Sequence, residues 1–268
     1  MTAGLSANWP LATGQKQMRI ASDGARAGSC ATPTLASVQR PVSQQPQSAL
    51  ALCSFSGGKD SCLALWRAQQ SGLDVRALLV MFEERGERSR SHALPAALLE
   101  RQADALGMEL IMRSASWATY ETVFVAALRE LKARGYEQAV FGDIDLQAHR
   151  DWEERVCAAA GLQARLPLWQ CDRNELAHEV IDSGFRAVVV CVDSKYLPDE
   201  FCGRDYDASF IADLPEGVDA CGENGEFHTF VYDGPNFANP VEFSVDGFEP
   251  YTAPKEYGGG RYCFAKLT

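Results

Sequence analysis

The sequence predicts an α/β protein in which a doubly wound parallel sheet is followed by a smaller C-terminal α+β domain. From residue 49 onward, short apolar runs alternate with segments of helical spacing, which is the order of βαβ units. These runs lack polar alternation, as expected for strands that are covered on both faces. The regular alternation ends after about residue 192, where stretches rich in Gly and Asp separate the remaining strands.

The first half of the chain supplies the elements of the parallel sheet. Strands are expected at 49–55, 75–82, 109–112 and 138–142, and helices at 59–70, 93–106 and 120–134. Pro95 would lie in the first turn of its helix, where proline is tolerated. A further helix carries Ala148, Trp152, Val156 and Ala159 at helical spacing.

The second half begins with a helix whose start is marked by Asp172 and Glu175, which have the spacing of a capping box. The run 185–192 predicts a buried strand, and 226–232, 241–248 and 261–267 also have strand character. Residues 1–48 are rich in Ala, Ser, Gln, Thr, Gly and Pro without a sustained period. We therefore expect a disordered extension at 1–48, a parallel-sheet domain at 49–169 and an α+β domain at 170–268.

Net charge, cysteine spacing and the length of the apolar runs exclude several classes of protein. The net charge of −11 disfavours a nucleic-acid partner, because affinity for phosphate backbones comes mainly from Lys and Arg. The nine cysteines contain no C-x-x-C pair and are expected to be reduced, mostly buried thiols. No signal peptide is apparent, and no apolar run approaches the ~20 residues that span a membrane. We expect a cytoplasmic protein.

A Gly-rich segment, SGGKDS at 56–61, joins the first strand to the first helix. Gly57 and Gly58 let backbone N–H groups approach phosphate oxygens, and the helix N-terminus adds positive potential there. Lys59 can offset charge on departing pyrophosphate, and Asp60 suggests Mg²⁺ held between phosphates. A Walker A loop is excluded, because Asp60 follows the lysine and Cys53 stands where the first glycine would be. The segment predicts cleavage of ATP between the α- and β-phosphates; a plain glycine turn is the alternative.

The segment and the helix after it resemble the PP-loop ATP pyrophosphatases. Over about residues 50–240 the chain resembles, more specifically, their diphthine–ammonia ligase-type branch. The motifs that carry this resemblance are His92 and the following helix, FGDI at 141–144, HR at 149–150 through RVC at 155–157, PLW at 167–169 and CGENGEFHTF at 221–230. The resemblance implies a parallel sheet of the PP-loop (HUP, or adenine nucleotide alpha hydrolase-like) type, with ATP and Mg²⁺ as ligands.

The last motif places two carboxylates, Glu223 and Glu226, around a tight turn. Beside ATP they could bind ammonium or a cationic substrate, hold Mg²⁺, or act as general base; a solvated polar turn is the alternative on residues alone. The resemblance assigns this element to the acyl-acceptor pocket. Together with Lys59, the two glutamates are therefore the expected catalytic residues.

At three positions the motif departs from the archaeal-type pattern, which usually has Gly, Tyr and Glu where this chain has Asn224, Phe227 and His228. Asn tolerates a left-handed turn position, so the first change is compatible with the same fold. The change from Glu to His alters the charge and puts diphthine in doubt as the acceptor.

The expected site residues form three sets. ATP would contact Ser56, Gly57, Gly58, Lys59, Asp60, Ser61, Met81 and Gly142; the acceptor would contact Arg150, Gly222, Asn224, His228 and Thr229; Mg²⁺ would bind Asp60 and Asp143. On residues alone, Asp143 could equally cap the next helix. Three further residues have a structural alternative to a role in the site. His92 could cap a helix, Arg150 could be a solvated cation and Trp169 could be a core residue.

The resemblance implies an ATP-dependent amide-forming ligase. A substrate carboxylate would attack the α-phosphate to give an acyl-adenylate and pyrophosphate, and ammonia or an amine would then displace AMP. The expected partners are ATP, a carboxylate-bearing acceptor (a small molecule if the chain is bacterial) and ammonia, without a membrane or a nucleic acid; we allow for a homodimer. The alternatives are a PP-loop RNA-modifying enzyme and a non-catalytic adenine-nucleotide-binding protein.

Overall fold

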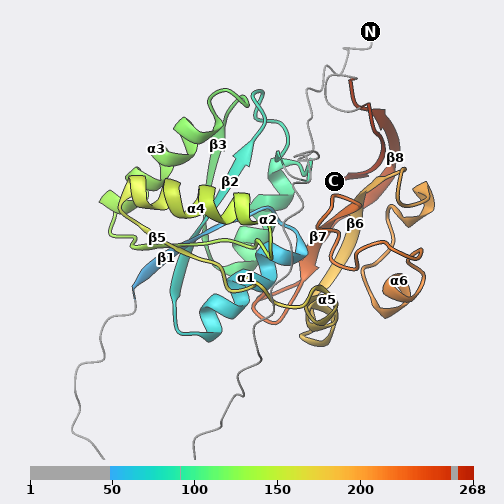
Figure 1. Cartoon of the computed structure of the whole chain (residues 1–268), viewed down its shortest axis with the longest axis horizontal. Coiled ribbons are helices and arrows are strands. Elements are labelled where there is room, and N and C mark those ends of the chain that lie inside the picture. Colours follow the sequence, from blue (N-terminus) through green and yellow to red (C-terminus); the bar gives the residue numbers. More distant parts are fainter. Residues whose placement is uncertain (1–48, 91, 255–258) are drawn as a thin grey trace, which may run out of the picture.

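The computed structural model describes residues 49–90, 92–254 and 259–268, so the expectation for 1–48 lies outside the described residues. Two sheets lie side by side (Figure 1). One has five strands in the order β3-β2-β1-β4-β5, and the other has four in the order β7-β6-β9-β8. The predicted α/β class and the separate C-terminal α+β unit are both confirmed.

The five-stranded sheet is parallel throughout. Its strands are β1 (Leu50–Ser54), β2 (Asp74–Phe82), β3 (Glu109–Ser114), β4 (Gln138–Val140) and β5 (Gln163–Arg165). The chain reverses its direction of winding between β1 and β4, and ligands of open α/β sheets bind at the carboxyl ends of the strands that flank such a point. The sequence did not reveal β5, because this edge strand has three residues and no buried side chain.

Two helices cover each face of this sheet (Figure 1). Alternate residues of β1 face opposite sides: Ala51 and Cys53 pack in the cluster with α1 (Lys59–Gln70) and α2 (Ala96–Leu106), and Leu52 packs with α3 (Tyr120–Ala133) and α4 (Gln147–Ala160). This alternation is what a doubly wound sheet requires, since both faces of its central strand β1 are buried.

Two of the expected helices differ in detail. Pro95 precedes α2 as its N-cap residue, with extended backbone, and does not form part of the first turn. The buried face of α4 consists of Glu153, Val156, Cys157 and Ala160, whereas Ala148 and Ala159 are exposed. Alanine fits either face of a helix, so its spacing alone could not orient α4.

The second sheet is antiparallel and contains β6 (Arg186–Asp193), β7 (Phe227–Asp233), β8 (Val245–Thr252) and β9 (Arg261–Leu267), with helices α5 (Arg173–Asp182) and α6 (Ala208–Ala212) and the 3₁₀ turn η1 (Asp199–Phe201) beside it. The predicted cap is confirmed: Asp172 accepts a hydrogen bond from the Glu175 N–H at 3.0 Å. β8 starts four residues later than expected. Val241 is buried and its N–H bonds to Tyr232, but it lies outside the strand.

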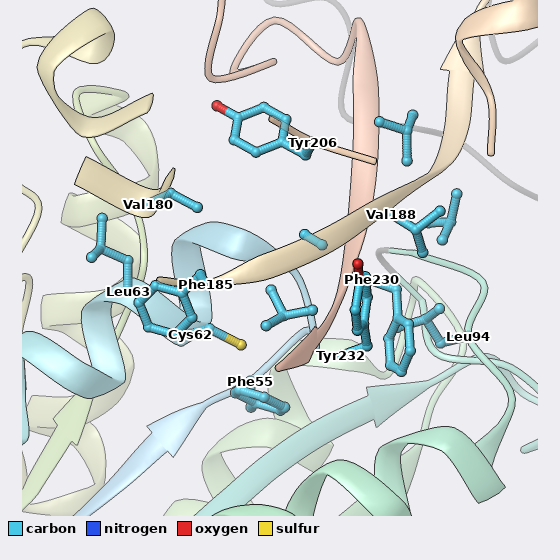
Figure 2. Close-up of a cluster of buried hydrophobic side chains, with 14 of the residues drawn as sticks. Phe55, Cys62, Leu63, Leu94, Val180, Phe185, Val188, Tyr206, Phe230 and Tyr232 are labelled. Carbon is cyan, nitrogen blue, oxygen red and sulfur yellow. The ribbon is translucent and has the colours of Figure 1, made fainter. Parts of the chain in front are cut away.

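A single hydrophobic core joins the two sheets. Figure 2 shows Phe55 and Cys62, from the parallel-sheet side, beside Val188 and Phe230 from β6 and β7. The contact continues through the main chain, because the Val231 N–H in β7 donates to the Gly57 carbonyl at 2.9 Å. The boundary at 169/170 stays a prediction. No helix in the described ranges is long and apolar enough to cross a membrane.

Candidate active site

Two positions of the loop between β1 and α1 have room only for glycine. Gly57 has a φ of +82°, and a Cβ on it would lie 2.7 Å from the Oε1 atom of Gln102. A Cβ on Gly58 would lie 2.7 Å from the ring of His92 and 3.1 Å from the Thr229 carbonyl. The loop is therefore packed between the start of α2 and strand β7.

The N–H groups of this loop donate to hydroxyl oxygens. Gly58 N–H donates to Ser56 Oγ at 3.3 Å, and Ser56 N–H donates to Ser61 Oγ at 3.3 Å. Lys59 N–H donates to Oγ1 of Thr229, from β7, at 3.1 Å. Phosphate oxygens can replace hydroxyls as acceptors, so the loop has the donors that a pyrophosphate group requires.

The side chain of Lys59 connects the loop to the C-terminal motif. It is 3% exposed, and its Nζ donates to both carboxylate oxygens of Asp60, at 2.9 and 2.7 Å, and to the Cys221 carbonyl. Burial alone would lower the pKa of Lys59, but the charge of Asp60, with smaller contributions from neighbouring groups, raises it. Lys59 is therefore a fixed cation that contacts both predicted motifs.

Gln102, on α2, is a positioning residue that the sequence did not reveal. Its side chain is fully buried, and its Nε2 donates to the carbonyls of Gly57, at 3.0 Å, and Val231, at 2.6 Å. The two carbonyls belong to the loop and to β7. Because these partners are 45 and 129 residues away, no local pattern indicates the contact.

A cavity of about 560 Å³ lies over the loop. Most of the predicted site residues line it: Ser56, Lys59, Asp60, Ser61, Met81, Gly142, Asp143, Gly222, Glu223, His228 and Thr229. Gly57 and Gly58, between Ser56 and Lys59, are not among the lining residues. Arg150, Asn224 and Glu226 are not among the lining residues. The tertiary structure therefore brings both motifs to one cavity.

Arg150 contacts protein groups elsewhere. Its Nε donates to Glu154 at 2.7 Å, one turn along α4, and its guanidinium lies 5.0 Å from the centre of the Trp169 ring. Trp169 is half-buried and so only partly a core residue. A role for Arg150 in acceptor binding stays a prediction.

The two glutamates of the C-terminal motif have different surroundings. Glu226 is 1% exposed, and its carboxylate accepts hydrogen bonds from Asp219 N–H and from the backbone and side chain of Asn224. Glu223 instead lines the cavity, where burial and the charges of Asp60 and Asp143 raise its pKa to about 8. Glu226 holds the turn together, whereas Glu223 faces the site.

The turn itself uses glycine at its left-handed positions. Gly222 and Gly225 have φ values of +70° and +83°, and Asn224 does not have a positive φ. The proposed tolerance of Asn for a left-handed position is therefore not needed. Asn224 instead bonds to Glu226 through its backbone N–H at 3.0 Å and its Nδ2 at 2.9 Å.

Asp143 follows β4 and remains ionised in the cavity. Burial opposes its charge, but hydrogen bonds from His149, at 2.6 Å, and from Glu153 lower its pKa overall. Glu153 is buried on α4, and burial together with its hydrogen bond to Asp143 raises its pKa to about 11. The raised pKa of Glu153 keeps its buried carboxyl group neutral beside Asp143, an arrangement that the sequence did not indicate.

The donor set fits Mg²⁺ that is shared with phosphates. Asp60, Asp143 and Glu223 line one cavity, where burial and, to a smaller extent, their mutual repulsion raise the pKa of Asp60 and Glu223, and an added cation would relieve both effects. Across the part of the chain that the structure describes, no three His, Cys, Asp or Glu side chains gather closely enough to form a metal cage. Mg²⁺ commonly takes one or two carboxylates and completes its shell with phosphates and water, which matches this set.

Two imidazoles, of His92 and His228, meet edge to face beside the loop, with ring centres 4.8 Å apart. His92 Nδ1 lies 3.0 Å from the Ser56 carbonyl, which can only accept, so Nδ1 carries the proton. Burial lowers the pKa of His92 to about 4 and that of His228 well below its usual range. The Nε2 atom of His228 is buried without a hydrogen-bond partner. Both rings are therefore neutral, and burial makes them weak bases.

Comparison with known proteins agrees with this geometry. The N-terminal domain of diphthamide synthase matches residues 49–164 and its C-terminal domain matches residues 172–252. The diphthine–ammonia ligases of Bos taurus and Rattus norvegicus are 27% and 28% identical over 231 residues, which cover 73% of this chain and 86% of each relative. That of Schizosaccharomyces pombe is 25% identical over 80% of this chain and 38% of its own length.

A solved structure described as a predicted subunit of tRNA methyltransferase from Methanocaldococcus jannaschii covers 69% of this chain and 98% of its own, with 17% identity and a TM-score of 0.40. That superposition is too loose to add to the assignment. The two domain matches together span nearly all of the described residues up to 252, and the motifs that they contain meet in one cavity. The chain therefore belongs to the diphthamide synthase family, in the diphthine–ammonia ligase branch of the PP-loop ATP pyrophosphatases.

Proposed function

We propose that the protein is an ATP-dependent ligase that adenylates a carboxylate and transfers ammonia or an amine to it, releasing AMP and pyrophosphate. The observation that carries the proposal is the position of Lys59, whose Nζ contacts Asp60 in the loop and the Cys221 carbonyl in the C-terminal motif. One cation thus lies where the nucleotide half and the acceptor half of the site meet.

In the first half-reaction, the loop N–H groups and Lys59 would bind the β- and γ-phosphates that leave as pyrophosphate. Fixed donors that face developing negative charge stabilise the transition state without reorganisation. Asp60 and Asp143 would hold Mg²⁺, which offsets phosphate charge and orients the phosphates. The carboxylate of the acceptor attacks the α-phosphorus, and the bond to the bridging oxygen of pyrophosphate breaks.

In the second half-reaction, ammonia attacks the acyl carbon and AMP leaves with the bonding electron pair. The nitrogen must lose a proton, and an unprotonated group within reach has to accept it. Glu223 lines the cavity, and its pKa, raised to about 8, makes its carboxylate a stronger base than an ordinary glutamate, whereas the lowered pKa of His228 makes that imidazole a weak base. The curated relatives are named diphthine–ammonia ligases, which favours ammonia as the nitrogen donor here.

The test is to identify the products formed from Mg-ATP labelled at the α-phosphate, in the presence of ammonium chloride and a carboxylate acceptor, beginning with diphthine, which the names of the relatives indicate. We expect AMP and pyrophosphate, and Lys59→Ala should lower their formation by roughly 10²–10³-fold, the scale of one lost donor to developing charge. Lys132→Ala, which changes an exposed lysine on α3, is the matched control. ADP as the main product would contradict the proposal, and so would ATP binding without any cleavage in the presence of the acceptor.

A further inference from the structure

Arg173, the first residue of α5, is not among the residues that line the cavity, but it connects two segments that reach it. Its Nε and Nη2 donate to the two carboxylate oxygens of Asp145 at 2.7 and 2.6 Å, and its Nη1 donates to Asp219 at 2.6 Å. Asp145 lies two residues after Asp143, between β4 and α4, and Asp219 lies just before the turn 221–226. A cation in the first turn of a helix opposes the helix dipole, so this position depends on the two carboxylates.

The carboxylate of Asp219 holds the main chain of the turn. One oxygen accepts a hydrogen bond from the Cys221 N–H at 2.9 Å, and the other accepts one from the Glu223 N–H at 3.2 Å. The Asp219 side chain is 10% exposed, and in the part of the chain that the structure describes Arg173 supplies the one cation within 4.0 Å of it. A carboxylate in such a position that loses its counter-charge must take up a proton or move toward water. Either change would weaken its bonds to the two N–H groups.

Two groups of the candidate active site depend on this main chain. The Cys221 carbonyl accepts a hydrogen bond from Lys59 Nζ, and the Glu223 side chain lines the cavity. A further contact joins the turn to α5, because Cys221 Sγ donates to the Arg173 carbonyl at 2.9 Å. Arg173 therefore influences the positions of Lys59 and Glu223 through the turn.

Arg67 forms a second ion pair with α5, which separates a contribution to stability from one to positioning. Its Nε donates to Glu179 at 2.8 Å and its Nη1 donates to the Pro167 carbonyl at 3.0 Å. The side chains of Arg67 and Arg173 are equally exposed, at 27% and 26%. Neither Arg67 nor Glu179 lines the cavity. Loss of Arg67 therefore weakens contacts of α5 without altering the turn, which makes it the matched control.

We propose that Arg173 is a positioning residue that holds residues 221–223 in the geometry the ligase reaction requires. Its planar guanidinium fixes Asp219 relative to Asp145, and so fixes the turn relative to the segment that follows β4. The proposal rests on the proposed function only for the reaction that this geometry serves. The anchoring of the turn can be measured without any substrate.

Alkylation by iodoacetamide, followed by peptide mass spectrometry, tests the anchoring in the ligand-free protein. The Cys221 thiol is 2% exposed, so its labelling requires the turn to open. Arg173→Ala should speed the labelling of Cys221 by roughly tenfold or more, because the local opening becomes easier, and Arg67→Ala should leave it unchanged. Cys53, fully buried in β1, reports global unfolding in the same samples and should stay unlabelled in both variants. Equal labelling of Cys221 in the two variants would overturn the proposal.

The rate of AMP formation from Mg-ATP, with ammonium chloride and diphthine, tests the effect on the reaction. Arg173→Ala should lower kcat by roughly 10–10²-fold, the scale of a misplaced catalytic group, while the KM for Mg-ATP changes by less than about threefold. Guanidinium chloride at millimolar concentration should restore part of this rate, because the free ion can bind between the two carboxylates. Arg67→Ala should keep the wild-type kcat.

Arg173→Lys decides the matter if Arg173→Ala does not fold. Lysine keeps the charge but cannot bind both carboxylates in a fixed fork, so kcat should fall severalfold with little change in KM. Equal rate losses in the Arg173 and Arg67 variants, without rescue by guanidinium, would show that the ion pair supplies stability alone and would overturn the proposal. So would a wild-type kcat in the folded Arg173 variants. A wild-type protein that forms no AMP would refute the ligase function, and the labelling experiment would still decide the anchoring of the turn.

Discussion

The clearest test of the site concerns Glu226, which the sequence grouped with Glu223 as catalytic. In the structure the Glu226 carboxylate is buried and accepts three hydrogen bonds, from Asp219 N–H at 3.3 Å, Asn224 N–H at 3.0 Å and Asn224 Nδ2 at 2.9 Å. Replacement by glutamine keeps the shape but turns one acceptor oxygen into a donor. We therefore expect Glu226→Gln to destabilise the fold.

The expected loss in the free energy of unfolding follows from these three hydrogen bonds. The oxygen that glutamine retains can keep the two hydrogen bonds that Oε1 accepts. Because the acceptor is no longer charged, each of these two bonds weakens by roughly 1 kcal/mol. The new amide group would face the Asn224 N–H, and a buried donor without an acceptor costs about 1–3 kcal/mol. The sum is roughly 3–5 kcal/mol, which at about 2–4 °C per kcal/mol lowers the unfolding midpoint by roughly 6 °C or more.

Differential scanning calorimetry of the ligand-free protein measures this shift, and Glu223→Gln is the matched control. That substitution makes the same chemical change three residues away, but it removes a charge that Asp60 and Asp143 repel. Its midpoint should stay the same or rise. Two results together would refute a structural role of Glu226 and support a catalytic one. The unfolding midpoint of Glu226→Gln would lie within about 2 °C of wild type, and the variant would lose as much AMP formation as Lys59→Ala.

Three further predictions concern the loop and the charge of the site. Gly58→Ala should abolish ATP binding in a calorimetric titration, because its Cβ would lie 2.7 Å from the His92 ring; normal affinity would show that the loop adapts. Gln102→Leu should lower the free energy of unfolding in urea by roughly 2 kcal/mol, since the Gly57 carbonyl and a β7 carbonyl each lose a buried donor; an unchanged midpoint would contradict this. The raised pKa of Glu223 stabilises the fold fully below pH 4.5, and this contribution is lost as the pH rises through about 8. The unfolding midpoint of wild type should therefore fall from pH 5 to 8 relative to Glu223→Gln, and parallel curves would show that Glu223 is not perturbed.

The phosphate-binding loop could be predicted from the sequence because its geometry is local. Consecutive residues form the strand, the turn and the helix, and the expected helix at 59–70 coincides with α1. The cap at Asp172 was predictable for the same reason, since its bond to Glu175 closes within one turn. The apolar runs of β2 and β6 also determined these strands, because both are buried on both faces.

Elements without a strong local pattern were harder to predict. β5 has three residues, none of them buried, and forms only because it pairs with β4 at the sheet edge. β8 is half-exposed along its length, so its bounds are set by the register with β9 and not by its own hydrophobicity. In both cases a partner strand supplies the hydrogen bonds that define the element.

Only the tertiary structure decides which of the site residues face the cavity and which are enclosed by the protein. Glu223 and Glu226 are equivalent in sequence terms, but one faces the cavity and the other is enclosed by its own turn. Arg90 is one of several arginines in its segment, and only the packing of the β2 and β3 ends buries its guanidinium against the Ala115 carbonyl and the Trp117 ring. The sequence determined which chemical groups are present and the local backbone that carries them. Burial and neighbouring charge set the protonation and the accessibility of each group, and both depend on residues far apart in the chain.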